Sequence, residues 1–291
     1  MRARLLLIAA VLAALACTAQ AATPETVYFS SADGRTELVG YLFKPAVGGP
    51  HAAIVMLHGR AGPYSSKVGG SCTQVGRDSS SPCGARTLSA RHESWGEYWA
   101  GHGYVALLVD SFGPRGRGHG YGRGTHEDPD REAVNELTVR PLDAQGGLAW
   151  LVQRADVKPD RVMLQGWSNG GSTALNAMHR QARGEAGPAR FKAALVFYPG
   201  CGNKALLARK LQLDAPLWLF LGADDEEVSP SICREVAARS GGPAGAPTVR
   251  WFNDATHDFD DPGKSRQAVP GNRIARDEVL GQAAALLDAV P

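Results

Sequence analysis

The chain has 291 residues, of which 44% are hydrophobic and 21% are charged, and its formal net charge is +2. These values are ordinary for one large folded domain and exclude a disordered or fibrous chain. The near balance of acidic and basic residues also gives no reason to expect nucleic acid or a membrane surface as a partner.

Residues 1–21 have the pattern of a secretory signal. Arg2 and Arg4 form a basic start, an apolar run follows over residues 5–16, and Ala19 to Ala21 provide the small side chains that a signal peptidase accepts. The apolar run is too short to span a bilayer comfortably. We therefore expect cleavage after Ala21 and a mature domain over residues 22–291.

An alternative interpretation makes Cys17 the lipid-modified residue of a lipoprotein, but Ala14 stands where such signals have a leucine. Cleavage after Ala21 instead predicts a periplasmic or secreted protein without a membrane anchor. Loss of Arg2 and Arg4 lowers the number of basic residues from 31 to 29, which equals the 29 acidic residues, so the mature domain is formally neutral. This pattern leaves the oligomeric state open.

Short β-rich runs alternate with helical runs along the rest of the chain, which is typical of a mostly parallel sheet with helices on both faces. We expect an antiparallel pair of strands at residues 26–29 and 38–43. The central and final strands are expected at residues 53–57, 105–109, 162–165, 193–198, 217–221 and 249–252. Helices are expected at residues 140–153, 169–183 and 273–290. One α/β domain without repeats or linkers follows from this order.

Two long segments fit neither pattern. Residues 60–86 are rich in Gly and Ser, and residues 113–130 alternate Gly with Arg and His. Long irregular segments in a compact domain are usually functional or disordered. Because both follow strands that should end at the same edge of the sheet, we expect them to form the rim or lid of a site.

Four cysteines remain in the mature domain, and an even number suits disulfide formation in an oxidising compartment. Three pairings are possible in principle. Because Cys72 and Cys83 lie in the same Gly/Ser-rich segment, we expect the pairs Cys72–Cys83 and Cys201–Cys233. No motif marks any of the four as a nucleophile or a zinc ligand.

The clearest chemical motif is Gly166-Trp167-Ser168-Asn169-Gly170, which matches G-x-S-x-G. It lies between an expected strand and an expected helix, and the motif needs a sharp turn there to expose the serine hydroxyl. The start of the following helix offers free amides and a partial positive charge to an oxyanion. The sequence therefore predicts Ser168 as the nucleophile of an α/β-hydrolase fold.

Partners for Ser168 follow in the order that this fold requires, an acid and then a histidine. Asp224 and Asp225 both come just after an expected strand, and a carboxylate there can orient a histidine on an adjacent loop. His257 follows the last strand, whereas His179 lies within the helix after Ser168 and is expected to be a packing or surface residue. We expect His257 to act as general base and the acid to fix its tautomer.

An oxyanion hole also needs a second amide from the loop after an early strand. His58-Gly59-Arg60 follows the strand expected at residues 53–57 and fits that position. We expect the backbone amides of Arg60 and Asn169 to form the hole together, with His58 holding the loop.

In combination, these segments resemble the dienelactone hydrolase family, especially its exported branch. The resemblance implies an α/β-hydrolase fold, a small-molecule ester as substrate and no cofactor. The segments that carry it run across nearly the whole mature chain and are Leu57-His58-Gly59, Val109-Asp110-Ser111-Phe112-Gly113-Pro114-Arg115-Gly116, Arg140-Pro141-Leu142-Asp143-Ala144, Gly166-Trp167-Ser168-Asn169-Gly170-Gly171, Tyr198-Pro199-Gly200-Cys201 and His257-Asp258-Phe259.

The resemblance also selects between the two candidate acids. Related hydrolases place the acid in a G-x-x-D-x-x-V pattern, which Gly222, Asp225 and Val228 match. Asp225 is therefore the expected acid, with Asp224 as the alternative. Relatives also carry a cysteine at the position of Cys233, in agreement with the second expected disulfide.

In one respect the chain departs from the family. The founding dienelactone hydrolases use a cysteine nucleophile, whereas this chain has Ser168. The expectation therefore moves from lactones toward carboxylic esters in general, cleaved through an acyl-enzyme. A serine depends on its base more than a cysteine does, because its hydroxyl is scarcely ionised near neutral pH.

Other functions are compatible with part of this pattern. A prolyl-oligopeptidase-type peptidase shares the turn and the residue order, but no second domain is present to gate peptides. A non-catalytic binding protein on a hydrolase scaffold would not need Ser168, Asp225 and His257 in register. A metal site in the acidic run at residues 224–227 lacks the spacing of a calcium loop, so a solvated loop is the expectation there.

Overall fold

The computed structural model describes residues 23–125, 127–202, 204–205, 207 and 210–291. The expected signal at residues 1–21 and the alternative lipid site at Cys17 lie outside the described residues. No helix within the described ranges is both long enough and apolar enough to cross a bilayer.

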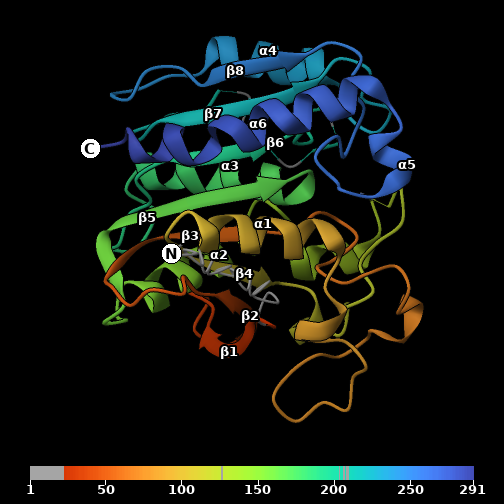
Figure 1. Ribbon diagram of the computed structural model, residues 1–291, viewed down its shortest axis with the longest axis vertical. Helices are drawn as coiled ribbons and strands as arrows, with labels where there is room; N and C mark the ends of the chain where they lie inside the picture. The colour runs from red at the N-terminus through yellow and green to blue at the C-terminus, as the bar shows by residue number, and fades with distance from the viewer. Residues whose placement is uncertain (1–22, 126, 203, 206, 208–209) are drawn as a thin grey trace, which may run out of the picture.

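An eight-stranded sheet forms the centre of the molecule, with the strand order β1-β2-β4-β3-β5-β6-β7-β8 (Figure 1). The β1–β2 and β2–β4 pairs are antiparallel, and the other neighbouring strands are parallel. The strands are β1 (Glu25–Ser30), β2 (Glu37–Phe43), β3 (His51–Leu57), β4 (Tyr104–Asp110), β5 (Val157–Trp167), β6 (Ala194–Phe197), β7 (Leu217–Gly222) and β8 (Thr248–Phe252). Each strand expected from the sequence is present, and the predicted α/β fold class is confirmed.

Helices cover both faces of this sheet, and Figure 1 shows α1 and α6 in front of it with α2 and α3 behind. The helices are α1 (Ala90–Gly101), α2 (Arg140–Leu151), α3 (Asn169–Ala182), α4 (Pro230–Arg239), α5 (Lys264–Gln267) and α6 (Pro270–Asp288). Helix α1 was not expected from the sequence, because charged residues and glycine interrupt its apolar pattern. The face of α1 that packs against the sheet carries Trp95 and Trp99, which lie one turn apart and are both at most 1% exposed.

The two long segments pack against each other at the carboxyl end of the parallel strands. They contain the short 3₁₀ helices η1 (Gly69–Ser71), η2 (Ala85–Thr87), η3 (Gly113–Arg115) and η4 (Pro129–Val134). The amide of Tyr121 donates to the carbonyl of Arg60 at 2.8 Å. Gly120 has φ +70°, and a Cβ there would lie 2.3 Å from the Ala61 backbone. The glycine is therefore needed both for its conformation and for this close approach.

Arg115 takes a structural position between these segments and α2. Its guanidinium donates to both carboxylate oxygens of Asp143, at 2.8 and 2.9 Å, and lies 3.5 Å from Asp33. A bidentate pair of this kind fixes the guanidinium in place. Arg115 therefore holds the loop after β4 against the start of α2.

Both expected cysteine pairs lie at disulfide distance. Cys72 and Cys83 have Cα atoms 5.6 Å apart, and those of Cys201 and Cys233 are 5.1 Å apart. These separations fit the predicted pairing. The first pair closes the segment between β3 and α1, and the second ties the loop after β6 to α4.

Candidate active site

Ser168 lies on a sharp turn between β5 and α3. It is a non-glycine residue with positive φ, at φ 52° and ψ −116°. The glycines around it permit the turn, because a Cβ at Gly166 would lie 2.2 Å from the carbonyl oxygen of Gly170. A Cβ at Gly170 would lie 2.1 Å from the carbonyl of Leu57 on the neighbouring strand. This turn is the strained strand-to-helix geometry that holds a serine hydroxyl out of the helix.

His257 and Asp225 reach Ser168 from the loops after β8 and β7. His257 Nε2 lies 3.1 Å from Ser168 Oγ, and His257 Nδ1 lies 2.8 Å from Asp225 Oδ2. The other carboxylate oxygen of Asp225 accepts the amides of Glu227 and Val228 at 2.8 and 2.9 Å. The structure thus brings Ser168, His257 and Asp225 together in hydrogen-bonding order, whereas Asp224 is exposed.

The surroundings of His257 favour its protonated form. Burial alone favours the neutral ring, but the hydrogen bond to Asp225 and the carboxylates of Asp258 and Glu227 outweigh burial and raise the pKa of His257 above 6.5. His257 is 2% exposed and Ser168 is 9% exposed. A proton accepted by this imidazole is therefore well stabilised, which is what a general base requires.

Arg60 and Asn169, the residues expected to supply amides to an oxyanion, both line the cavity beside Ser168. Between these loops, a Cβ at Gly59 would lie only 3.6 Å from the Ser168 Cβ. Arg140, fully buried behind both loops, donates to the carbonyl of His58 at 2.8 Å and to the side-chain oxygen of Asn169. The sequence marked Arg140 only as part of a shared segment.

Besides Asp225, two further acidic residues of the run at 224–227 contact this site, contrary to the expectation of a solvated loop. Glu226 Oε2 accepts the amide of His257 at 2.9 Å. The Glu227 carboxylate lies 3.9 Å from His257 Nε2 and forms a bidentate pair with Arg60 at 3.0 to 3.1 Å. At 9% side-chain exposure, Glu227 is close to buried. The pairing to Arg60 was hidden from the sequence because 167 positions separate the partners.

A buried carboxylate supports the loop of His257 from behind. Asp260 Oδ2 accepts the indole N–H groups of Trp95 and Trp167 at 2.7 and 2.8 Å, and Oδ1 accepts the Tyr198 hydroxyl. Burial raises the pKa of Asp260 despite these donors and nearby Arg91. The Tyr198 ring centroid lies 4.6 Å from that of His257, so this network reaches the imidazole.

A cavity of about 220 Å³ opens beside Ser168, smaller than the roughly 300 Å³ at which common ligand pockets begin. Its described lining comes from the two long segments, the stretch from η4 to the start of α2, the turn of Ser168, α3 and the loops after β6 and β7. The lining residues are Arg60, Arg123, Gly124, Arg131, Glu136, Ser168, Asn169, Ser172, Gly200, Ala205, Glu226, Glu227 and Val228. Arg123 and Gly124 belong to the segment expected to form a rim, and they do line this cavity.

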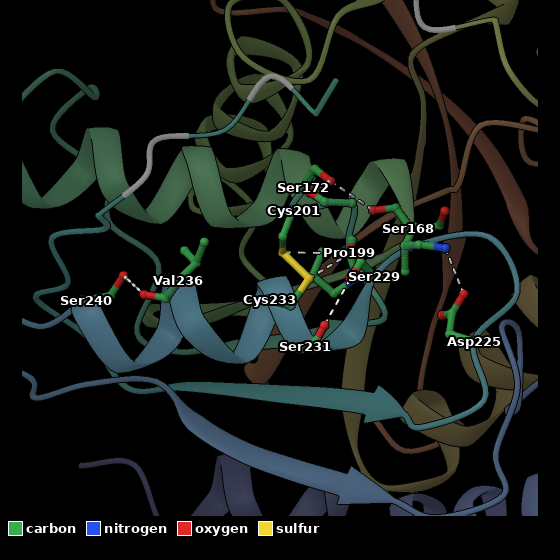
Figure 2. The surroundings of a disulfide bond; sticks show 12 residues. Ser168, Ser172, Pro199, Cys201, Asp225, Ser229, Ser231, Cys233, Val236 and Ser240 are labelled. Atoms are coloured by element: carbon green, nitrogen blue, oxygen red, sulfur yellow. Dashed lines mark hydrogen bonds between the residues drawn. A yellow bond between two sulfur atoms is a disulfide. The ribbon is translucent and has the colours of Figure 1, made fainter. Parts of the chain in front are cut away.

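Figure 2 shows the Cys201–Cys233 pair next to this site, with Ser172 on the adjoining helix α3 and Ser168 on the turn before it. Gly200, the residue before Cys201, forms part of the cavity wall, and its carbonyl accepts the Ser172 hydroxyl at 3.0 Å. The disulfide therefore anchors one wall of the cavity to α4.

Glu227, His257 and Asp258 place possible metal ligands within 4.8 Å of one another. Each already has a partner: Glu227 pairs with Arg60, His257 with Asp225, and Asp258 with Arg91 at 2.7 Å. The three groups are thus used within the protein itself, and their arrangement is explained without a cation.

A mostly parallel sheet with helices on both faces and a serine at a strained strand-to-helix turn define an α/β-hydrolase. The sequence profile of the dienelactone hydrolase family matches residues 85–289, and the chain belongs to this family. Because a lactone is a cyclic ester, the protein is a hydrolase of ester bonds.

Solved structures share this fold at low sequence identity. An esterase from the Planctomycetes species Thermogutta terrifontis, solved with propionate bound, is 20% identical, with a TM-score of 0.58, over 89% of this chain and 94% of that one. A dienelactone hydrolase-like promiscuous phosphotriesterase from metagenomic libraries is 19% identical, with a TM-score of 0.62, over 92% of this chain and 98% of that one.

Proposed function

We propose that the protein is a serine esterase that cleaves carboxylic esters through an acyl-enzyme on Ser168. The observation that carries the proposal is the continuous hydrogen-bonded chain from Ser168 Oγ through His257 to Asp225, at 3.1 and 2.8 Å. His257 takes the Ser168 proton during attack and returns it to the leaving alcohol. Asp225 fixes the tautomer with the proton on Nδ1 and stabilises the imidazolium.

The oxyanion of the tetrahedral intermediate is bound by the backbone amides of Asn169 and Arg60. Asn169 begins α3, so its amide adds the partial positive charge of the helix start. Water then attacks the acyl-enzyme by the same proton transfers in the second half of the reaction. Export to an oxidising compartment is part of this proposal, since two cysteine pairs at disulfide distance suit it.

Labelling of the purified mature protein with a fluorophosphonate, followed by peptide mass spectrometry, tests the proposal. We expect one adduct on Ser168, absent in Ser168→Ala and strongly reduced in His257→Ala. Ser231→Ala, at an exposed serine of α4, is the control and should label normally. Hydrolysis of phenyl acetate should follow the same pattern. A folded, disulfide-intact protein that neither labels nor cleaves phenyl acetate would instead be a binding protein on a hydrolase scaffold.

A further inference from the structure

The described lining of the cavity beside Ser168 is rich in charged side chains. Six of its described lining residues are charged, three of each sign, and Val228 is the largest aliphatic side chain among them. Ligand sites are more often lined by apolar and aromatic side chains with few polar groups. The charged lining residues are Arg60, Arg123, Arg131, Glu136, Glu226 and Glu227.

Four of these six are already neutralised by neighbours. Arg60 and Arg123 both contact Glu227, at 3.0 and 2.6 Å. Glu226 pairs with Arg266 at 2.8 Å. Their charges and most of their hydrogen-bonding capacity are therefore used inside the protein.

Arg131 is different. It is 6% exposed, and its guanidinium carbon lies 4.6 Å from the Tyr121 ring centroid. Stacking of this kind uses the face of the guanidinium and leaves its N–H edges. Within the described part of the chain, its side chain has no hydrogen bond and no ion pair. Arg131 therefore lines the cavity with N–H groups that an acceptor on a ligand can bind.

Glu136 is the acidic counterpart. It is 3% exposed, and its backbone carbonyl is held by Asn176 Nδ2 at 2.8 Å. Arg140 interacts with its charge but donates its hydrogen bonds to His58 and Asn169. In the described residues the Glu136 carboxylate accepts no hydrogen bond, so it lines the cavity as an acceptor that a donor on a ligand can reach.

We propose that Arg131 and Glu136 form a subsite for hydroxyl groups, and that the substrates are esters of small, uncharged, hydroxyl-rich molecules. This inference rests on the proposed esterase function. A hydroxyl group both donates and accepts, so neighbouring hydroxyls satisfy the Glu136 carboxylate and the Arg131 guanidinium together. The ligand is neutral because the charges that line the cavity balance.

Two other substrate classes fit this cavity less well. An alkyl chain would remove water from Arg131 and Glu136 without replacing its hydrogen bonds, and among the described lining residues it would find only the small aliphatic side chains of Ala205 and Val228. A carboxylate would suit Arg131 but would be repelled by the Glu136 carboxylate, which forms no ion pair in the described residues. A site built to bind hydroxyls rejects analogues that lack them by large factors.

Matched ester pairs test the inference on the unmodified mature protein. One pair is glycerol monoacetate and propyl acetate, and the other is methyl 2,3-dihydroxypropanoate and methyl propanoate. Each kcat/KM is divided by the rate constant for hydrolysis by hydroxide, which removes differences in intrinsic reactivity. We expect the hydroxylated member of at least one pair to be preferred about tenfold or more. The first pair varies the alcohol part of the ester and the second varies the acyl part. The pair that shows the preference therefore identifies which part the cavity binds.

Phenyl acetate separates this inference from the proposed function. If phenyl acetate is cleaved but the alkyl ester is preferred in both pairs, or methyl hydrogen succinate exceeds them all, the hydroxyl subsite is wrong and the esterase stands. If phenyl acetate is not cleaved and Ser168 does not label, both proposals fail.

Substitutions then assign the preference to residues. Glu136→Gln and Arg131→Met are each expected to reduce the hydroxylated-to-alkyl ratio about tenfold, because each removes one charged hydrogen bond to substrate. Glu132→Gln, at an exposed position of the same segment, should leave the ratio unchanged. Equal losses on both members of a pair would mean that Arg131 and Glu136 only support the fold, and would overturn the assignment.

Discussion

Arg140, at the start of α2, donates a hydrogen bond to the carbonyl oxygen of His58 at 2.8 Å. The same guanidinium also donates to the side chain of Asn169, so one buried cation joins the two loops that carry the proposed oxyanion donors. Burial lowers the pKa of Arg140 to about 10, so the group stays charged at neutral pH.

Arg140→Met should lower kcat about 10- to 100-fold with little change in KM, because misplaced amides lose part of their transition-state stabilisation. It should also lower the free energy of unfolding by about 2–4 kcal/mol, since two buried acceptors lose their donor. Phenyl acetate kinetics and urea unfolding measure the two effects. Arg154→Met, which removes a partly exposed pair with Asp156, should cost under about 1 kcal/mol and leave kcat intact. Normal kcat in Arg140→Met would exclude the positioning role.

The choice between the two neighbouring aspartates has a direct test. Asp225→Asn should reduce kcat about 1,000- to 10,000-fold, because the amide no longer fixes the correct tautomer of His257. Asp224→Asn changes an exposed side chain and should retain at least half of the activity. Both variants should show the same near-UV circular dichroism as the parent. If Asp224→Asn lowered kcat more than Asp225→Asn, Asp224 would be the acid that orients His257.

Glu227 should contribute to the pH dependence through its effect on the pKa of His257. The neutral imidazole is the active base, and the pKa of His257 is raised above 6.5, so kcat/KM should fall on the acid side with a midpoint above pH 6.5. Glu227→Gln removes a carboxylate 3.9 Å from Nε2, which destabilises the imidazolium and moves this midpoint to lower pH. At pH 6 the variant should then keep a larger fraction of its maximal activity. Glu235→Gln, on the exposed side of α4, serves as control, and an unmoved midpoint in Glu227→Gln would contradict the assignment.

The two disulfides should differ in what they stabilise. Loop-closure entropy over 32 residues predicts a loss of about 4 kcal/mol for Cys201→Ala/Cys233→Ala, and 11 residues predict about 3 kcal/mol for Cys72→Ala/Cys83→Ala. Because Gly200 lines the cavity, the first variant should also raise KM. Urea unfolding and ester kinetics of both variants measure these changes. If KM rose only in the Cys72→Ala/Cys83→Ala variant, the Cys201–Cys233 disulfide would not be what holds the cavity wall in place.

Local patterns explain why much of this protein could be predicted from its sequence. The β-rich runs, the glycines on either side of Ser168 and the position of His257 after the last strand each follow from neighbouring residues alone. Helix α1 escaped prediction, because Trp95 and Trp99 become a buried stripe only once the sheet is beside them. Sequence periodicity alone could not separate Asp224 from Asp225, which differ by one position on a turn.

The lining of the cavity could not be predicted for another reason. Arg60 meets Glu227 across 167 positions, and Arg131 of the short helix η4 stacks on Tyr121 of the irregular loop before it. Such partners are selected by the folded arrangement of loops, which no short-range pattern encodes. The sequence predicts a solvated loop for the acidic run for the same reason, since burial of Glu227 depends on arginines from two other segments.

Asp260 accepts hydrogen bonds from Trp95, Trp167 and Tyr198, which belong to α1, β5 and the loop after β6. Three donors on one buried carboxylate couple these elements over evolutionary time. Loss of the Asp260 carboxylate leaves three buried donors without this acceptor, and loss of any one donor removes a hydrogen bond from a buried carboxylate, so a change at one of the four positions favours a compensating second change. Among members of this family, these four residues should therefore change together. The residues that line the substrate cavity beside Ser168 should vary independently of them.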